Sequence, residues 1–227
     1  MRPNVPAIGR GFGAVALALV LVTAACGSDD DTAAPETTEH GHDQAESAPT
    51  TELRNGMRKL WADHMQWTYA TVDAFFHNAD SLQPTLDRLL ANQGDIGAAI
   101  VPFYGQDAGD QLTQLLTTHI NEAVPVLQAA QSGDDSALQA ALDKWYANAQ
   151  EVADFLAAAD PDNWPQSATR PALEMHIDQT TAYAVDLLEG DYARAIEDYD
   201  AAFDHMLELA DTLAAGLVDR FPERFTA

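Results

Sequence analysis

The chain has 227 residues, of which 36 are acidic and 11 are basic, so its formal net charge is −25. Hydrophobic residues make up 47% of the sequence, too large a share for a wholly disordered chain. The length allows one or two domains with a sizeable core. The excess of acid argues against nucleic-acid binding, which needs clustered Lys and Arg. A single cysteine excludes a disulfide framework and a thiolate zinc cluster.

The N-terminal residues have the pattern of an export signal. Arg2 and Arg10 precede an apolar run over residues 11–25, which is short for a stable membrane span. This pattern predicts a signal peptide over residues 1–25, and small residues precede the single cysteine, Cys26. The junction resembles the lipobox of bacterial lipoproteins. That resemblance implies lipidation of Cys26 and anchoring on the extracytoplasmic face of the cell membrane. The alternative is an ordinary signal peptide followed by an incidental cysteine.

The next segment, residues 26–52, is acidic, polar and free of aromatic residues. Such a composition cannot bury enough apolar surface to fold. We therefore expect a disordered tether between the anchor and the folded domain. The segment contains His40 and His42, and we interpret both as part of a solvated linker rather than as a metal site.

The remaining residues, 53–227, have the apolar spacing of amphipathic helices throughout, with no convincing period of two. Gly or Asn followed by Asp or Ser separates several of the segments, as is typical where one helix ends and the next begins. The sequence therefore predicts an all-α domain. Six helices are expected, over residues 53–77, 81–101, 108–131, 135–158, 168–189 and 191–220.

An internal repeat organises these helices into three tandem antiparallel hairpins, over about residues 53–104, 108–160 and 167–221. A shift of 57 residues places His119 on His176 and Gly133 on Gly190 without a gap. In the first hairpin Asn78 takes the position of these glycines, which predicts a left-handed helix cap there. Chance similarity among alanine-rich acidic helices is the alternative, but it does not explain why a histidine and a turn residue recur together. The repeat predicts a helical bundle of three hairpins.

Each hairpin has a histidine on its first helix and an acid on its second, 31 or 32 residues apart. In an antiparallel hairpin this separation brings both residues to the same level of neighbouring helices. The histidines fall on apolar stripes, so we expect them and the acids to point inward, where polar groups need partners. The pairs are His64 with Asp95, His119 with Glu151, and His176 with Glu208.

Two functions fit this pattern. If the hairpins bring all six side chains together, they form a ligand set for a divalent metal such as Zn, Fe, Mn, Ni or Cu. The protein would then serve in metal sensing, storage or delivery. If they do not converge, each pair is a structural brace within a non-metal binding or scaffold protein. Asn92, Asn148 and His205, about one turn from the acids, are candidate partners that would support the ligands. Glu122, one turn beyond His119, is an optional further ligand.

The sequence contains no phosphate-binding loop and no nucleophile with an adjacent base. We therefore assign no catalytic residue, and any enzymatic activity would depend on the metal. Three segments resemble a group of secreted or membrane-anchored bacterial helical proteins, and the resemblance extends over most of residues 53–221. It implies a fold and an address but no reaction. The segments are residues 60–68 (LWADHMQWT), 102–105 (PFYG) and 145–148 (WYAN).

Overall fold

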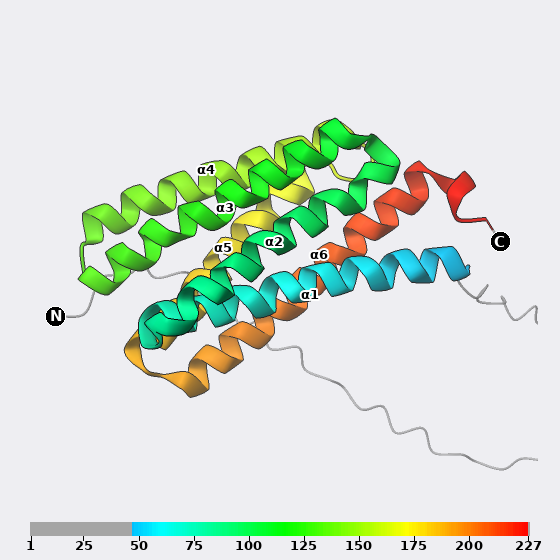
Figure 1. Ribbon diagram of the computed structural model, residues 1–227. Helices are drawn as coiled ribbons and strands as arrows, with labels where there is room; N and C mark the ends of the chain where they lie inside the picture. Colours follow the sequence, from blue (N-terminus) through cyan, green and yellow to red (C-terminus); the bar gives the residue numbers. More distant parts are fainter. Residues whose placement is uncertain (1–46, 227) are drawn as a thin grey trace, which may run out of the picture. The chain divides into compact units, whose positions relative to one another are not determined.

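A computed structural model describes residues 47–226 (Figure 1). The predicted signal peptide, Cys26 and all but the end of the predicted tether lie outside these residues. The described part is all-α, as the sequence predicts, and contains no strand. Its elements are α1 (Ala48–His77), α2 (Ala79–Tyr104), α3 (Gln106–Ser132), α4 (Asp135–Ala159), α5 (Gln166–Glu189), α6 (Tyr192–Arg220) and the short 3-10 helix η1 (Pro222–Arg224).

The first helix begins five residues before its expected start at residue 53. Ser47 caps α1 by accepting a hydrogen bond from the Thr50 backbone N–H, and a proline occupies the first turn. Both features favour a helix start at this point. The Ser47 hydroxyl also donates to the carbonyl oxygen of Phe225, at 2.6 Å. The start of the helical domain and its C-terminal residues therefore lie together.

Two of the three hairpin turns follow the predicted chemistry. Gly133 and Gly190 end α3 and α5 in the left-handed conformation, with φ of 68° and 76°. The aspartate after each glycine caps the next helix through its side chain. The prediction for Asn78 is wrong, because its φ is −148°. In the first hairpin α2 begins at the very next residue, so the chain has no room for a left-handed residue followed by a separate cap.

The three hairpins do not stand apart, because each helix packs against the next along the chain and α6 returns to pack against α1 (Figure 1). Helix α5 additionally contacts α1 and α3. The first helices of the three hairpins therefore meet inside the bundle. None of the helices in residues 47–226 is both long enough and apolar enough to cross a membrane.

Candidate metal centre

The three repeated histidines converge in the core of the bundle. His64 on α1, His119 on α3 and His176 on α5 are 2%, 5% and 3% exposed, which confirms the expectation that they point inward. The ring of His176 lies between the other two, with centroid separations of 5.5 Å to His64 and 5.7 Å to His119. The contacts of α5 with α1 and α3 bring these three side chains together.

All three rings line one small cavity of about 40 Å³. Its wall also includes three threonines, Thr68, Thr71 and Thr180, together with Trp145 and several aliphatic side chains. Among the described residues that line it, none is Asp, Glu, Lys or Arg. The cavity is large enough for one or a few water-sized occupants. Among residues 47–226, the only groups in its wall that can change charge near neutral pH are the imidazoles themselves.

Burial keeps these imidazoles neutral. Desolvation, with a smaller contribution from the neighbouring His119, lowers the pKa of His64 to about 3. Desolvation also lowers the pKa of His119 to about 4, although a hydrogen bond with Asn148 partly offsets the effect. The pKa of His176 falls well below its ordinary value because of burial and the three surrounding histidines. A neutral imidazole is the form that binds a metal ion, so all three rings are suited to coordination near pH 7.

The tautomer of His119 follows from its neighbours. The Asn148 side-chain Nδ2 donates to the Leu115 carbonyl at 3.2 Å, which turns its Oδ1 toward His119 Nδ1 at 3.0 Å. An amide oxygen can only accept, so His119 Nδ1 carries the hydrogen and Nε2 carries the lone pair. Asn148 therefore leaves Nε2 as the coordinating atom of His119.

The hydrogen bond to a backbone carbonyl recurs in all three hairpins. In each, a side chain on the second helix donates to the carbonyl oxygen four residues before the repeated histidine of the first helix. The donors and acceptors are Asn92 to Leu60 at 3.1 Å, Asn148 to Leu115 at 3.2 Å, and His205 to Ala172 at 2.8 Å. These bonds tie the two helices of every hairpin together close to its histidine. The three residues predicted to support the site thus occupy equivalent positions.

The expectation that the acids point inward is wrong. Asp95, Glu151 and Glu208 are all exposed, and the Asp95 carboxylate lies 3.6 Å from a guanidinium nitrogen of Arg88 instead of near a histidine. The sequence separation fixed the level of each acid along its helix. It did not determine which face of the helix the acid occupies, because successive residues are rotated by about 100° around the helix axis. The residues that face the histidine helix lie three positions earlier, at Asn92, Asn148 and His205.

The optional further ligand, Glu122, is half-buried and lies outside the cavity wall.

Sequence reasoning missed three groups near the histidines. Gln93 is fully buried, and its Nε2 lies 3.4 Å from His64 Nδ1. Thr180 and Trp145 line the cavity. The position of Thr180 one helical turn after His176 was the available signal.

The three imidazoles are close enough to share an ion but are not yet arranged around one. Imidazoles bound to one ion through N–metal bonds of about 2.0–2.1 Å have ring centroids about 5 Å apart, near the two observed separations. In residues 47–226, however, no group of three or more His, Cys, Asp or Glu side chains is already positioned to hold a metal. Coordination by all three histidines would require their rings to turn within the cavity.

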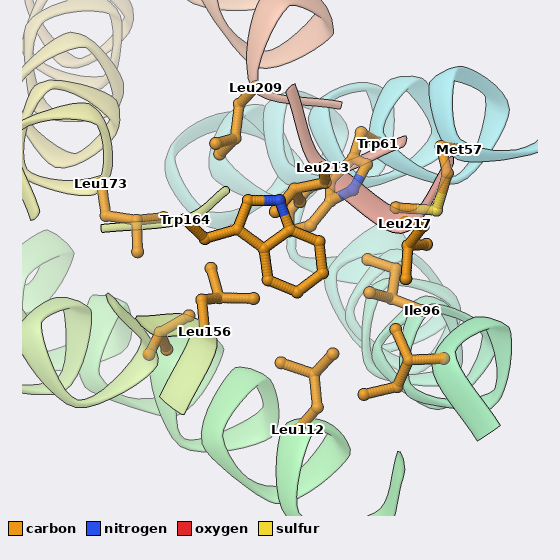
Figure 2. Close-up of a pocket in the computed structure, with 12 residues that line it drawn as sticks. Met57, Trp61, Ile96, Leu112, Leu156, Trp164, Leu173, Leu209, Leu213 and Leu217 are labelled. Atoms are coloured by element: carbon orange, nitrogen blue, oxygen red, sulfur yellow. The ribbon is translucent and has the colours of Figure 1, made fainter. Parts of the chain in front are cut away.

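A second cavity, of about 20 Å³, lies in the same bundle and is entirely apolar at its surface. Figure 2 shows the indole ring of Trp164 among leucine side chains from several helices. Trp164 comes from the α4–α5 connection, donates to the Thr212 carbonyl at 3.3 Å, and packs so closely on Gly216 that a Cβ there would overlap its ring. Trp61 connects the two regions, because it lines this cavity and its ring lies 5.7 Å from that of His64.

Comparison with protein-family models, with curated proteins and with solved structures finds no match for this chain.

Proposed function

We propose that this protein binds a divalent metal ion through His64, His119 and His176. The observation that carries the proposal is the gathering of three buried, neutral imidazoles in one cavity, with neighbouring rings 5.5 and 5.7 Å apart. Packing alone does not account for three buried histidines with no acidic or basic side chain between them. Buried imidazole nitrogens lower stability unless they have partners. A shared ion would supply a partner to every ring.

The ligand chemistry narrows the choice of ion. Of the metals considered from the sequence, imidazole ligands suit Zn, Cu, Ni and Fe, whereas Mn prefers carboxylate and water oxygens. The three carboxylates that would have favoured Mn lie on the exposed surface. We therefore propose Zn²⁺, Cu²⁺, Ni²⁺ or Fe²⁺ as the bound ion.

We also propose that the protein is held at the extracytoplasmic face of the membrane by a lipid on Cys26. The support is the sequence of the first 26 residues alone. In this arrangement the acidic tether would allow the helical domain to take up metal outside the cytoplasm, for sensing, storage or delivery. No catalytic role is proposed.

The metal proposal is tested with the full chain after metal is stripped with a chelator. Titration calorimetry with Zn²⁺, Cu²⁺ and Ni²⁺ should reveal one ion bound per chain. An ion at a hundredfold excess over its Kd should raise the free energy of unfolding by about 2.7 kcal/mol.

A matched pair of variants locates the site. His64→Gln should abolish this binding and the stabilisation. His77→Gln should retain both, because His77 is on the same helix but pairs with Asp73 away from the cavity. Equal metal binding by the two variants would overturn the assignment.

A second function is favoured by the bonds that Asn92, Asn148 and His205 make to backbone carbonyls. In a scaffold protein these bonds, together with the one between His119 and Asn148, would hold the hairpins in register without any metal. A brace between histidine and carboxylate does not fit, because the acids are exposed. Absence of metal binding in the wild type, combined with unfolding of a triple His64/His119/His176→Gln variant, would favour the scaffold.

A further inference from the structure

The cavity has polar groups that no protein atom satisfies. His176 Nδ1, Thr180 Oγ1 and Trp145 Nε1 are all buried and have no hydrogen-bond partner, and all three side chains line the same cavity. Leaving such groups unpaired inside a protein core is unfavourable. The cavity therefore suits an occupant that accepts hydrogen bonds.

The other hydroxyl groups in the wall are already engaged. Thr68 donates to the His64 carbonyl, and Thr71 donates to the Trp67 carbonyl, each at 2.7 Å. The Thr180 hydroxyl lies near the phenol of Tyr183, where it partly offsets the rise in pKa that burial causes. Neither the Thr180 hydroxyl nor the Tyr183 phenol forms a hydrogen bond of normal geometry. Thr180 and Trp145 are therefore the donors available to an occupant.

Charge balance points to the sign of that occupant. Three neutral imidazoles around a divalent ion would leave a charge of +2 in a buried site. Among the described residues that line the cavity there is no carboxylate to compensate it. An uncompensated buried charge is strongly unfavourable. The ion would thus require a negative ligand from solution.

We propose that the metal ion is bound together with a small inorganic anion, which occupies the coordination position left by the three histidines and accepts hydrogen bonds from Thr180 and Trp145. The cavity volume of about 40 Å³ leaves room beside an ion for hydroxide or an anion of a few atoms, and not for an organic substrate. This inference rests on the proposed metal site and adds the class of its second ligand.

The test uses Co²⁺ in the full chain, because the visible absorption of Co²⁺ reports on its ligands. Azide, a three-atom anion, is titrated into the Co²⁺-loaded protein. We expect azide to shift the absorption with saturation. Thr180→Val should weaken azide binding by about tenfold, the loss of one hydrogen bond to a charged group, while leaving Co²⁺ binding in place. Trp145→Phe should weaken it by a similar factor.

Thr71→Val is the matched control, because it makes the same change in the same cavity to a hydroxyl that is already bonded to Trp67. It should leave azide affinity unchanged. The outcomes separate the two proposals. Failure of Co²⁺ to bind would overturn the metal site and this inference with it. Binding of Co²⁺ with an absorption insensitive to azide would overturn only the anion ligand. Equal effects of Thr180→Val and Thr71→Val would remove Thr180 from the site.

Discussion

Two neighbouring cavities in the described part of the bundle have opposite chemistry. One is small and is lined by aliphatic and aromatic side chains, Trp164 among them. The other is lined by three imidazoles and contains unpaired polar groups. Trp61 borders the first and contacts a histidine of the second. The same helices therefore support an apolar region and a polar region within one core.

The difference separates what stabilises this fold from what it can bind. The side chains that line the apolar cavity stabilise the fold through dispersion contacts and the burial of apolar surface, so truncating any of them lowers stability. The histidine cavity does not stabilise the fold in the same way. Burial of its neutral rings and unpaired donors lowers stability, and the surrounding packing offsets this cost. The presence of such groups in a core is best explained by a binding role for them. Substitutions in the two cavities should therefore change stability and its pH dependence in different ways.

Acidification should have the largest effect, and it should act through the histidine cavity. The pKa values of His64 and His119 are about 3 and about 4 in the folded chain, against about 6.5 in an unfolded chain. Above about pH 6.5 neither state takes up these protons, and their contribution to stability is complete. As the pH falls through 6.5 toward 4, only the unfolded chain is protonated, so the free energy of unfolding should fall by on the order of 2–3 kcal/mol per histidine.

Urea unfolding followed by circular dichroism between pH 7.5 and 4 measures this effect. Protonation of the many surface carboxylates acts in the same range, so the informative quantity is the difference between the wild type and His119→Gln. The variant should lose less stability on acidification. Identical pH profiles for the two proteins would contradict the assignment of the depressed pKa to His119.

Removal of Trp164 should have the next largest effect, and it should act through the apolar cavity. Trp164→Ala leaves a void beside Gly216 and should lower the free energy of unfolding by about 3–5 kcal/mol. Trp67→Ala is the comparison, because Trp67 is only half-buried, beneath the guanidinium of Arg88, and should cost less. The pH dependence that belongs to the histidines should survive in the Trp164 variant. Its disappearance would show that the two cavities are not independent.

Removal of the hydrogen bonds that asparagine side chains make near the histidines should have the smallest effect on stability. Asn148→Ala removes the bonds to the Leu115 carbonyl and to His119, and should lower the free energy of unfolding by about 2 kcal/mol. Asn92→Ala removes the equivalent bond to Leu60 but no comparable bond to a histidine, and should cost about 1 kcal/mol. Urea unfolding of both variants measures the difference. A larger loss from Asn92 than from Asn148 would contradict the role given to His119.

Much of this fold was available in the sequence. The 3.6-residue periodicity and the Gly–Asp pairs at 133–134 and 190–191 predicted six helices to within a few residues at most ends. The repeat identified the three histidines as equivalent and inward. Prediction failed at Asn78, where the short connection replaced the expected cap, and at Ser47, where local capping extended α1 beyond the composition boundary.

The candidate site was only half predictable. Hairpin geometry placed Asp95, Glu151 and Glu208 at the level of the histidines. Successive residues are rotated by about 100° around a helix axis, so the level of a residue does not determine which face of the helix it occupies. Gln93 and Trp145 had no recognisable motif, and the spacing of Thr180 from His176 was not sufficient to identify it. The role of a polar residue on an apolar stripe becomes clear only when its neighbours are known.

The sequence by itself determined that this chain forms helices, where they turn, and that three histidines occupy matching positions. These properties depend on local spacing and capping, which act within one helix or one hairpin. Only the tertiary structure decided that the histidines meet in one cavity and that the acids remain outside it. That outcome depends on the packing of α5 against α1 and α3, which arises from contacts among hairpins far apart in the chain.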